Sequence, residues 1–194
     1  MKRFLDLLQT VALLIIATVL VSGLVRQNVR TDSPKTNPPG VPVSLAGIET
    51  IGGGPVGIVE FSDFECPYCA SFAANTWPAL KAEFIQQNRV TFAFWNLPLE
   101  SHPHALEAAS KALCAPDFWI AHDRLFSDIT ADLPWTAKCE GTAKSQGDAA
   151  KGFGVRSTPT FFIGKVAGDG VHVQAVIQGA APIGDFRKAI EGVK

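Results

Sequence analysis

The chain has 194 residues, a length that suits one globular domain with a short appendage. Its hydrophobic fraction of 47% excludes a disordered chain, and its net charge of −1 argues against a nucleic-acid-binding protein. Four cysteines are too few for a small domain that depends on several disulfides.

The amino-terminal segment predicts a membrane-spanning helix. Lys2 and Arg3 precede residues 7–25, which carry no charge. As a helix this run measures about 28 Å, close to the thickness of about 30 Å of a bilayer core. A cleaved signal peptide is the alternative, with an imperfect cleavage site at residues 21–23. Because the apolar run is long, we expect an uncleaved signal anchor over residues 1–25.

Residues 26–42 predict a linker. Residues 31–34 (TDSP) and 37–40 (NPPG) are turn and breaker residues, and no hydrophobic period appears. We therefore expect the globular domain to occupy residues 43–194.

The domain opens with a pattern typical of a β-α-β unit. Residues 56–61 form a nearly continuous apolar run, as in a strand that is buried on both faces. Residues 67–87 suit a helix that Pro78 should kink. Residues 90–95 are aromatic and β-branched, which favours a second strand.

Residues 98–157 predict a helical block. Alanines over residues 105–112 favour one helix, and apolar side chains mark one face of another over residues 118–129. The connection is far longer than the dozen or so residues that a crossover needs. We therefore expect an inserted helical subdomain.

The chain closes with a predicted hairpin and helix. Residues 160–166 and 171–177 read as strands that are joined by a Gly- and Asp-containing turn. Residues 183–193 have the apolar spacing of an amphipathic helix. The fold class is therefore α/β.

The motif Cys66-Pro67-Tyr68-Cys69 lies where the first predicted strand gives way to a helix. Residues three apart on a helix are neighbours, so the two sulfurs can form a disulfide. A helix start has free N–H groups and a partial positive charge, which stabilise a thiolate at Cys66. Cys69 lies deeper in the helix and can resolve a mixed disulfide by attacking Cys66.

Half of a zinc site is the alternative interpretation of this motif. Zinc needs two more ligands in a compact pattern, whereas Cys114 and Cys139 are isolated and the histidines are scattered. His102 and His104 resemble the start of a helix more than a metal pair, and His122 fits a satisfied core residue. We expect no metal and no organic cofactor.

Two further positions suggest a role beside the cysteines. Glu60, on the first strand, can exchange a proton with the resolving thiol if it is buried; an exposed strand-end glutamate is the alternative. Pro159 must lie at a strand start or edge, and the Thr158–Pro159 bond is either cis or an ordinary trans bond.

Two segments carry a resemblance to a known family. Residues 60–69 read EFSDFECPYC and residues 154–162 read GVRSTPTFF. Together with the Pro98 to Ala115 and Phe118 to Asp123 stretches, they resemble the DsbA-like branch of the thioredoxin superfamily. The resemblance covers residues 43–194.

The resemblance implies a thioredoxin fold with a helical insertion over residues 98–157. It also implies thiol–disulfide exchange outside the cytoplasm, in the periplasm or at the cell exterior. The expected partners are exported proteins with cysteine pairs and a redox partner that resets the disulfide. By the family pattern, Cys66 is the nucleophile, Cys69 is the resolving thiol and Glu60 is the buried acid. The residues expected to face the substrate are Pro67, Tyr68, Thr158 and the cis-proline Pro159.

Two departures leave the direction of exchange open. Tyr68 stands where the best-known DsbA enzymes have histidine, and Thr158 stands where they have valine; both features occur in related disulfide isomerases. Only the linker at residues 26–42 separates the predicted span from the domain, which leaves no room for a dimerisation domain. We therefore expect a monomeric oxidase, with a reductase or isomerase as the first alternative and a metal-handling protein as the second.

Cys114 and Cys139 are 25 residues apart within the helical block. An oxidising compartment favours a structural disulfide between them, and two free buried cysteines are the alternative.

Overall fold

The computed structural model describes residues 42–194. The chain divides into two units, residues 1–35 and 36–194, and the described residues belong to the second. The predicted signal anchor and nearly all of the linker lie outside the described residues. No helix within residues 42–194 is long and apolar enough to cross a bilayer.

Six strands, six α-helices and one π-helical turn make up the described domain. The strands are β1 (Val43–Ser44), β2 (Glu49–Gly52), β3 (Val56–Ser62), β4 (Val90–Asn96), β5 (Thr160–Ala167) and β6 (Gly170–Gln178). The helices are α2 (Pro67–Asn75), α3 (Trp77–Leu80), α4 (Ala105–Cys114), α5 (Phe118–Ser127), α6 (Ala137–Gly152) and α7 (Ile183–Glu191). A π-helical turn, η1 (Lys81–Ile85), continues α3.

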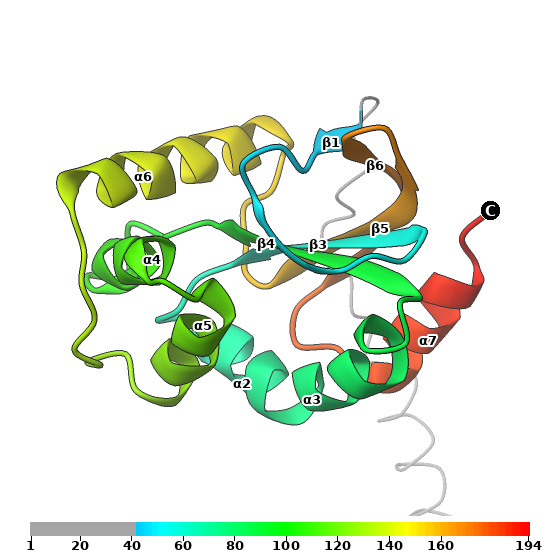
Figure 1. Cartoon of the computed structure of the whole chain (residues 1–194), viewed down its shortest axis with the longest axis horizontal. Helices are drawn as coiled ribbons and strands as arrows, with labels where there is room; N and C mark the ends of the chain where they lie inside the picture. The colour runs from blue at the N-terminus through cyan, green and yellow to red at the C-terminus, as the bar shows by residue number, and fades with distance from the viewer. Residues whose placement is uncertain (1–41) are drawn as a thin grey trace, which may run out of the picture. The chain divides into compact units, whose positions relative to one another are not determined.

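The strands form one sheet in the order β1-β6-β5-β3-β4-β2. β3 runs parallel to β4 and antiparallel to β5, so it lies inside the sheet with a partner on each side. In Figure 1, α2, α3 and α7 lie along one side of the sheet and α6 lies along the other. The carboxyl ends of β3 and β4 therefore lie at the same edge, where α2 begins.

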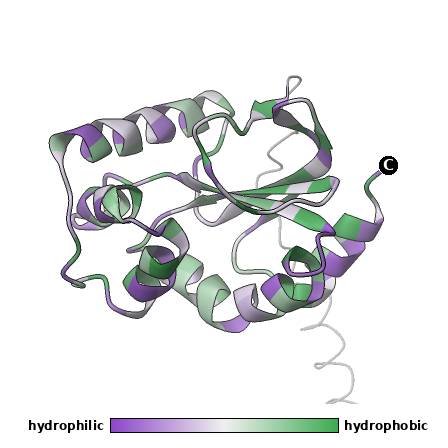
Figure 2. Cartoon of the chain, viewed as in Figure 1, coloured by the Kyte–Doolittle hydropathy of each residue, from purple (hydrophilic) through white to green (hydrophobic). Residues whose placement is uncertain are grey.

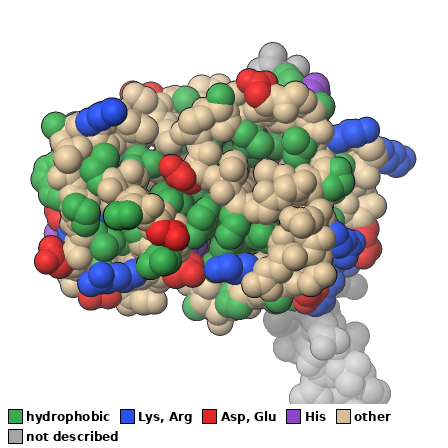
Figure 3. All heavy atoms as spheres, in the orientation of Figure 1, with side chains coloured by type: hydrophobic (Ala, Val, Ile, Leu, Met, Phe, Trp, Pro, Cys, Tyr) green, Lys and Arg blue, Asp and Glu red, His purple; other side chains and the backbone are tan. Residues whose placement is uncertain are grey.

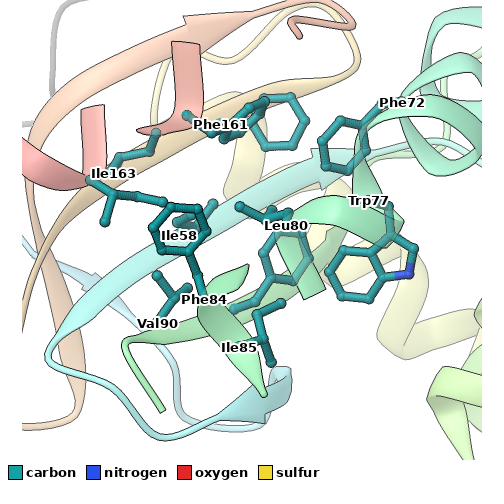
Figure 4. Close-up of a cluster of buried hydrophobic side chains, with 12 residues drawn as sticks. Ile58, Phe72, Trp77, Leu80, Phe84, Ile85, Val90, Phe161 and Ile163 are labelled. Carbon is teal, nitrogen blue, oxygen red and sulfur yellow. The ribbon is translucent and has the colours of Figure 1, made fainter. Parts of the chain in front are cut away.

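Alternation along β3 divides the core into two layers. Ile58 packs with Phe72, Leu80 and Phe186 on the side of α2, α3 and α7, a cluster shown in Figure 4. Val59 and Phe61 point to the opposite side, where they pack with residues of β4, β5 and the end of α6. Figure 2 shows the resulting contrast between apolar strands and helices that carry both polar and apolar residues.

The helices between β4 and β5 form the inserted subdomain that the sequence predicts. Their alanines and aromatic side chains build a third cluster around Phe94 and Phe118. The inserted subdomain is fixed to the sheet by the Trp95 indole N–H, which donates to the Gln146 carbonyl at 2.7 Å. The disulfide between Cys114 and Cys139 joins α4 to α6.

The observed elements differ from the predicted ones in three places. The sequence analysis missed β1 and β2, because each is too short for a period to show. The predicted helix over residues 67–87 is interrupted at Thr76, since Pro78 has no N–H to donate to the preceding turn. Within the predicted helical block, α6 is a third helix whose few large apolar residues gave no clear pattern.

Charged side chains are mixed by sign on the surface. On the face seen in Figure 3, Lys and Arg side chains are spread among Asp and Glu side chains. This distribution agrees with the near-zero net charge of the chain.

Candidate active site

The two cysteines of the motif lie at the amino end of α2. Cys66 is the N-cap residue with an extended backbone, and Pro67 occupies the first turn, where its missing N–H costs no hydrogen bond. Cys69 lies one turn further along and is fully buried, whereas Cys66 is 4% exposed. Both are free thiols in this structure, so the geometry is that of the reduced pair.

The surroundings give the two thiols opposite acidities. The pKa of Cys66 is lowered to about 5, mainly by a hydrogen bond from the Cys69 thiol. Burial opposes this lowering, whereas the nearby Thr158 side chain and the amides of Cys69 and Tyr68 lower the pKa further. Burial raises the pKa of Cys69, and the neighbouring charges of Glu60 and Cys66 raise it further. Cys66 is therefore the thiolate of the pair, and Cys69 holds the proton.

Glu60 lies within the sheet on the same side as Ile58. It is fully buried, between Phe94 of β4 and Phe161 of β5 in the strand register. Neither carboxyl oxygen has a hydrogen-bond partner among the described residues. Burial raises the pKa of Glu60 to about 8, and the nearby Ser62 hydroxyl, outside hydrogen-bonding geometry, opposes the rise only in part. The exposed strand-end alternative is wrong, and the acid can exchange a proton near neutral pH.

The segment before β5 faces Cys66. The Thr158–Pro159 peptide bond is cis, and the Cys66 thiol group lies 3.4 Å from the Thr158 carbonyl oxygen. Two hydrogen bonds hold the segment: the Thr160 hydroxyl donates to the Ser157 carbonyl at 2.7 Å, and an amide of the loop after β6 donates to the Pro159 carbonyl. The segment is thus fixed beside the nucleophile, although it is 92 residues away in the sequence.

Pro67 and Tyr68 form the exposed rim of the motif. The Tyr68 side chain is 66% exposed, an unusual position for a large aromatic residue. An exposed ring two residues from Cys66 suits a contact role.

Sequence reasoning missed Asp63 and the role of His102. Asp63 is 2% exposed, and its carboxylate lies 2.8 Å from Nδ1 of His102. His102 lies in the loop after β4, and the hydrogen bond to Asp63 is the main factor that raises its pKa. The signal that sequence offers is positional: both residues follow parallel strands, so their side chains meet at one edge of the sheet.

The remaining candidates do not join the site. His122 lies in the aromatic core, with Nδ1 2.8 Å from Asp123 but with no hydrogen-bond partner on Nε2, so it is only half satisfied. The Cys114–Cys139 pair is a disulfide and belongs to the inserted subdomain. Within residues 42–194, no three His, Cys, Asp or Glu side chains are grouped in a way that could hold a metal ion.

Comparison with known proteins agrees with this arrangement. Residues 53–133, which include the cysteine motif, match the family model described as Thioredoxin. The crystal structure of Wolbachia pipientis alpha-DsbA1 superposes with a TM-score of 0.66 at 18% identity, over 77% of this chain and 92% of that one. The chain has the thioredoxin fold.

Curated relatives match over a shorter stretch of the chain. The probable disulfide bond formation protein D of Bacillus cereus is 35% identical over 82 residues, which is 40% of this chain and 38% of that protein. The Na(+)/H(+) antiporter NhaA 3 of Salinispora tropica is 33% identical over 134 residues, 56% of this chain and 20% of that protein. The chain thus spans little more than a third of the length of the disulfide bond formation protein.

Proposed function

We propose that this DsbA-like chain oxidises paired cysteines in exported proteins through a redox-active Cys66–Cys69 disulfide. The observation that carries the proposal is the contrast between the two thiols. The pKa of Cys66 is lowered to about 5, while burial raises that of Cys69. A stabilised Cys66 thiolate favours the reduced pair, and a pair that prefers to be reduced is an oxidant toward other thiols.

The reaction transfers two electrons from substrate to enzyme. A substrate thiolate attacks Cys66 Sγ and breaks the Cys66–Cys69 bond, and Cys69 leaves as a thiolate that takes up a proton. The second substrate thiolate then attacks the substrate sulfur of the mixed disulfide and releases Cys66 as a thiolate. The substrate gains one disulfide, the enzyme holds the Cys66 thiolate and the Cys69 thiol, and a separate redox partner must accept the two electrons to reset the enzyme.

Glu60 supplies the proton that Cys69 needs. Its pKa of about 8 keeps the buried carboxyl protonated at neutral pH, and its charge interacts with Cys69. A carboxylic acid at this position can donate to the departing thiolate and take the proton back in the reverse reaction.

The rim around Cys66 binds the substrate. The Thr158 carbonyl oxygen lies 3.4 Å from Cys66 Sγ in the reduced protein. The backbone of Thr158 and Pro159 offers polar groups to an extended peptide, and the exposed Pro67 and Tyr68 offer apolar contact. Backbone contacts of this kind accept many sequences, which suits a broad range of substrates.

We also propose that residues 7–25 anchor the protein in a membrane, with the domain on the extracytoplasmic side. The uncharged run supports the anchor. The Cys114–Cys139 disulfide supports an oxidising compartment, because such bonds are rare in the cytosol. We propose further that the protein acts as a monomer on partners that pass the membrane.

Trapping of the mixed disulfide tests this function. The Cys69→Ser variant, once oxidised with a small disulfide on Cys66, should form a covalent complex with a reduced, unfolded protein that has a single cysteine. The complex should persist on a non-reducing gel and disappear with dithiothreitol, because neither Cys69 nor a second substrate thiol is present to resolve it. The Cys66→Ser variant is the matched control and should trap nothing. Equal trapping by both variants, or by neither, would contradict the proposal.

A reductase or isomerase of the same fold is the second candidate. Tyr68 and Thr158 favour this candidate, because disulfide isomerases related to DsbA also have residues other than the histidine and valine of the best-known DsbA enzymes at these two positions. The trapping experiment does not separate the two directions, whereas the reduction potential of the pair does.

A further inference from the structure

Asp63 is a buried carboxylate with hydrogen-bond donors on two sides. Its side chain is closed off from solvent, and Oδ1 accepts a hydrogen bond from the Glu65 amide at 2.8 Å, within the segment that leads into α2. Oδ2 accepts one from the Leu99 amide at 2.8 Å, in the loop after β4, and lies 2.8 Å from Nδ1 of His102. Burying a carboxylate costs free energy unless it finds such partners. The side chain of Asp63 therefore joins the segment before α2 to the loop after β4.

The same residue shapes the turn that presents Cys66. The Cys66 amide donates to the Asp63 carbonyl at 3.1 Å, and the bond from the Glu65 amide to the Asp63 side chain lies inside this turn. An aspartate that binds the amide two residues ahead stabilises a turn locally. The helix α2 follows at once, because the Ala70 amide donates to the Cys66 carbonyl at 3.0 Å. Cys66 is thus fixed between a turn that Asp63 closes and the first hydrogen bond of the helix.

Further hydrogen bonds tie this turn to the loop after β4. The Leu97 amide donates to the Ser62 carbonyl at 2.8 Å, and the His104 amide donates to the Glu65 carboxylate at 2.6 Å. The bond to Glu65 is exposed, whereas Asp63 is 2% exposed. Hydrogen bonds that are shielded from water are electrostatically stronger. The bonds of the Asp63 side chain are therefore the firmer constraint on the turn.

The orientation of Cys66 decides which groups stabilise its thiolate. The pKa of Cys66 is lowered mainly by the hydrogen bond from the Cys69 thiol, against the effect of burial. The Thr158 side chain and the amides of Cys69 and Tyr68 lower it further. Hydrogen-bond donors act only at short range and at favourable angles. A change in the orientation of Cys66 would therefore weaken several of these contacts together.

We propose that Asp63 is a positioning residue for disulfide exchange, which holds Cys66 in the orientation where the groups around it stabilise the thiolate. Asp63 acts through the backbone of the turn and through the tie to the loop after β4, not through its own charge. This inference rests on the proposed function, because it concerns the sulfur that is the proposed nucleophile.

The direction of the effect separates positioning from charge. A negative charge near a thiolate disfavours the thiolate, so removal of the Asp63 charge alone would lower the pKa of Cys66. Loss of orientation acts the other way, because the thiolate then loses hydrogen-bond donors. If positioning dominates, the Asp63→Ala substitution should raise the pKa of Cys66.

The absorbance of the thiolate as a function of pH tests this in the reduced full-length chain. Asp63→Ala should raise the pKa of Cys66 by at least about half a unit, so that its thiolate fraction at low pH falls about threefold. Asp63→Asn keeps one oxygen for the turn and should give a smaller rise. Asp128→Ala is the matched control: Asp128 accepts from the Thr130 amide at 2.9 Å in a turn of the same kind, after α5. The control should titrate like the unsubstituted protein, and an unchanged or lowered pKa in Asp63→Ala would overturn the proposal.

A double-mutant cycle with His102 separates the turn from the ring. Since Asp63 also holds the His102 ring, an effect that passed through the charge of this ring would disappear once the ring is replaced. The rise caused by Asp63→Ala should instead keep its size in a His102→Gln background. Loss of the rise in that background would overturn the proposal.

Amide hydrogen exchange needs no variant and decides the case in which Asp63→Ala fails to fold. In the reduced, unsubstituted chain, the amides of Glu65, Cys66 and Leu99 should exchange at least about a hundredfold more slowly than in an unfolded peptide of the same sequence. Unprotected exchange at Glu65 or Leu99 would show that the tie does not persist and would overturn the proposal. These measurements involve no substrate, whereas failure of the proposed function would appear separately as an absence of mixed disulfides in the trapping experiment.

Discussion

Cys66 and Cys69 are one helical turn apart, yet their thiols differ in both access and acidity. The helix start, the Cys69 hydrogen bond and the Thr158 segment all act on Cys66. Cys69 is enclosed by the sheet and by Glu60. The asymmetry fixes which sulfur a partner meets first.

This asymmetry predicts selective alkylation. At pH 6, iodoacetamide should modify Cys66 in the Cys69→Ser variant at least about tenfold faster than Cys69 in the Cys66→Ser variant, because only a thiolate reacts. The rate for Cys66 should fall as the pH drops through about 5. Mass spectrometry of quenched samples measures both rates, and equal rates at pH 6 would refute the assignment of the nucleophile.

Glu60 predicts a pH-dependent stability. Its pKa is raised from 4.5 in the unfolded chain to about 8 in the folded one, so its neutral form is favoured by folding. Its contribution is fully present below about pH 4.5 and is lost as the pH rises through about 8. In the oxidised protein, where Cys66 and Cys69 do not titrate, Glu60→Gln should raise the free energy of unfolding at pH 8.5 by on the order of 3 kcal/mol.

Urea denaturation at several pH values checks this prediction. The difference between Glu60→Gln and the unsubstituted protein should shrink toward zero at pH 4.5. Glu83 is a contrasting control: its hydrogen bond with Arg187 lowers its pKa, so Glu83→Gln should not raise the free energy of unfolding at pH 8.5. A constant difference across the pH range would show that Glu60 is not the titrating group.

Whether a site residue could be predicted from the sequence depends on how far away in the chain its partner lies. The cysteines, Glu60 and the proline segment were predictable, because a motif or a strand pattern marks each one locally. The Asp63–His102 pair was not, since its contact spans 39 residues and depends on how the loop after β4 folds back. Sequence patterns report the period of an element and not the path of a loop.

At the level of elements, the inserted subdomain depends on α4 and α6 staying together. Their sequences are rich in alanine and small polar residues, so little apolar area is buried between them. The Cys114–Cys139 disulfide links the end of α4 to the first turn of α6. We therefore expect the disulfide to contribute much of the stability of this subdomain.

Removing this disulfide should destabilise the domain. The Cys114→Ala/Cys139→Ala variant should lose about 3.5 kcal/mol of unfolding free energy, the loop-entropy value for a sequence separation of 25 residues. The Cys66→Ser/Cys69→Ser variant is the control, because its cysteines enclose so short a loop that its loss should be much smaller. Urea denaturation of both variants checks the order, and an unchanged midpoint for the first would contradict this role.

Helices and strands could be predicted from the sequence where their hydrophobic period extends over enough residues. β3, β4, β5, β6, α4, α5 and α7 lie within a few residues of their predicted bounds. β1 and β2 are held by pairing with distant strands rather than by their own residues. The break between α2 and η1 needed the structure, because Pro78 marks its place but not the π-helical turn that follows.

At the scale of the whole molecule, residues 7–25 should remain attached to the mature protein. Their length matches a bilayer core, so the full-length chain should stay in the membrane fraction after alkaline carbonate extraction. Amino-terminal sequencing of the mature protein provides the check. A mature terminus near Leu24 would show that a signal peptide is cleaved and would contradict the predicted membrane anchor.

The direction of exchange is the central claim, and the reduction potential of the Cys66–Cys69 pair tests it most directly. Thiolate stabilisation sets this potential, and a Cys66 pKa of about 5 lies between the values of about 3.5 for DsbA and about 7 for thioredoxin. Equilibration of the full-length chain with glutathione buffers, read out by alkylation and mass, should therefore give about −180 mV. A potential near the thioredoxin value of about −270 mV would contradict the account and identify a reductase.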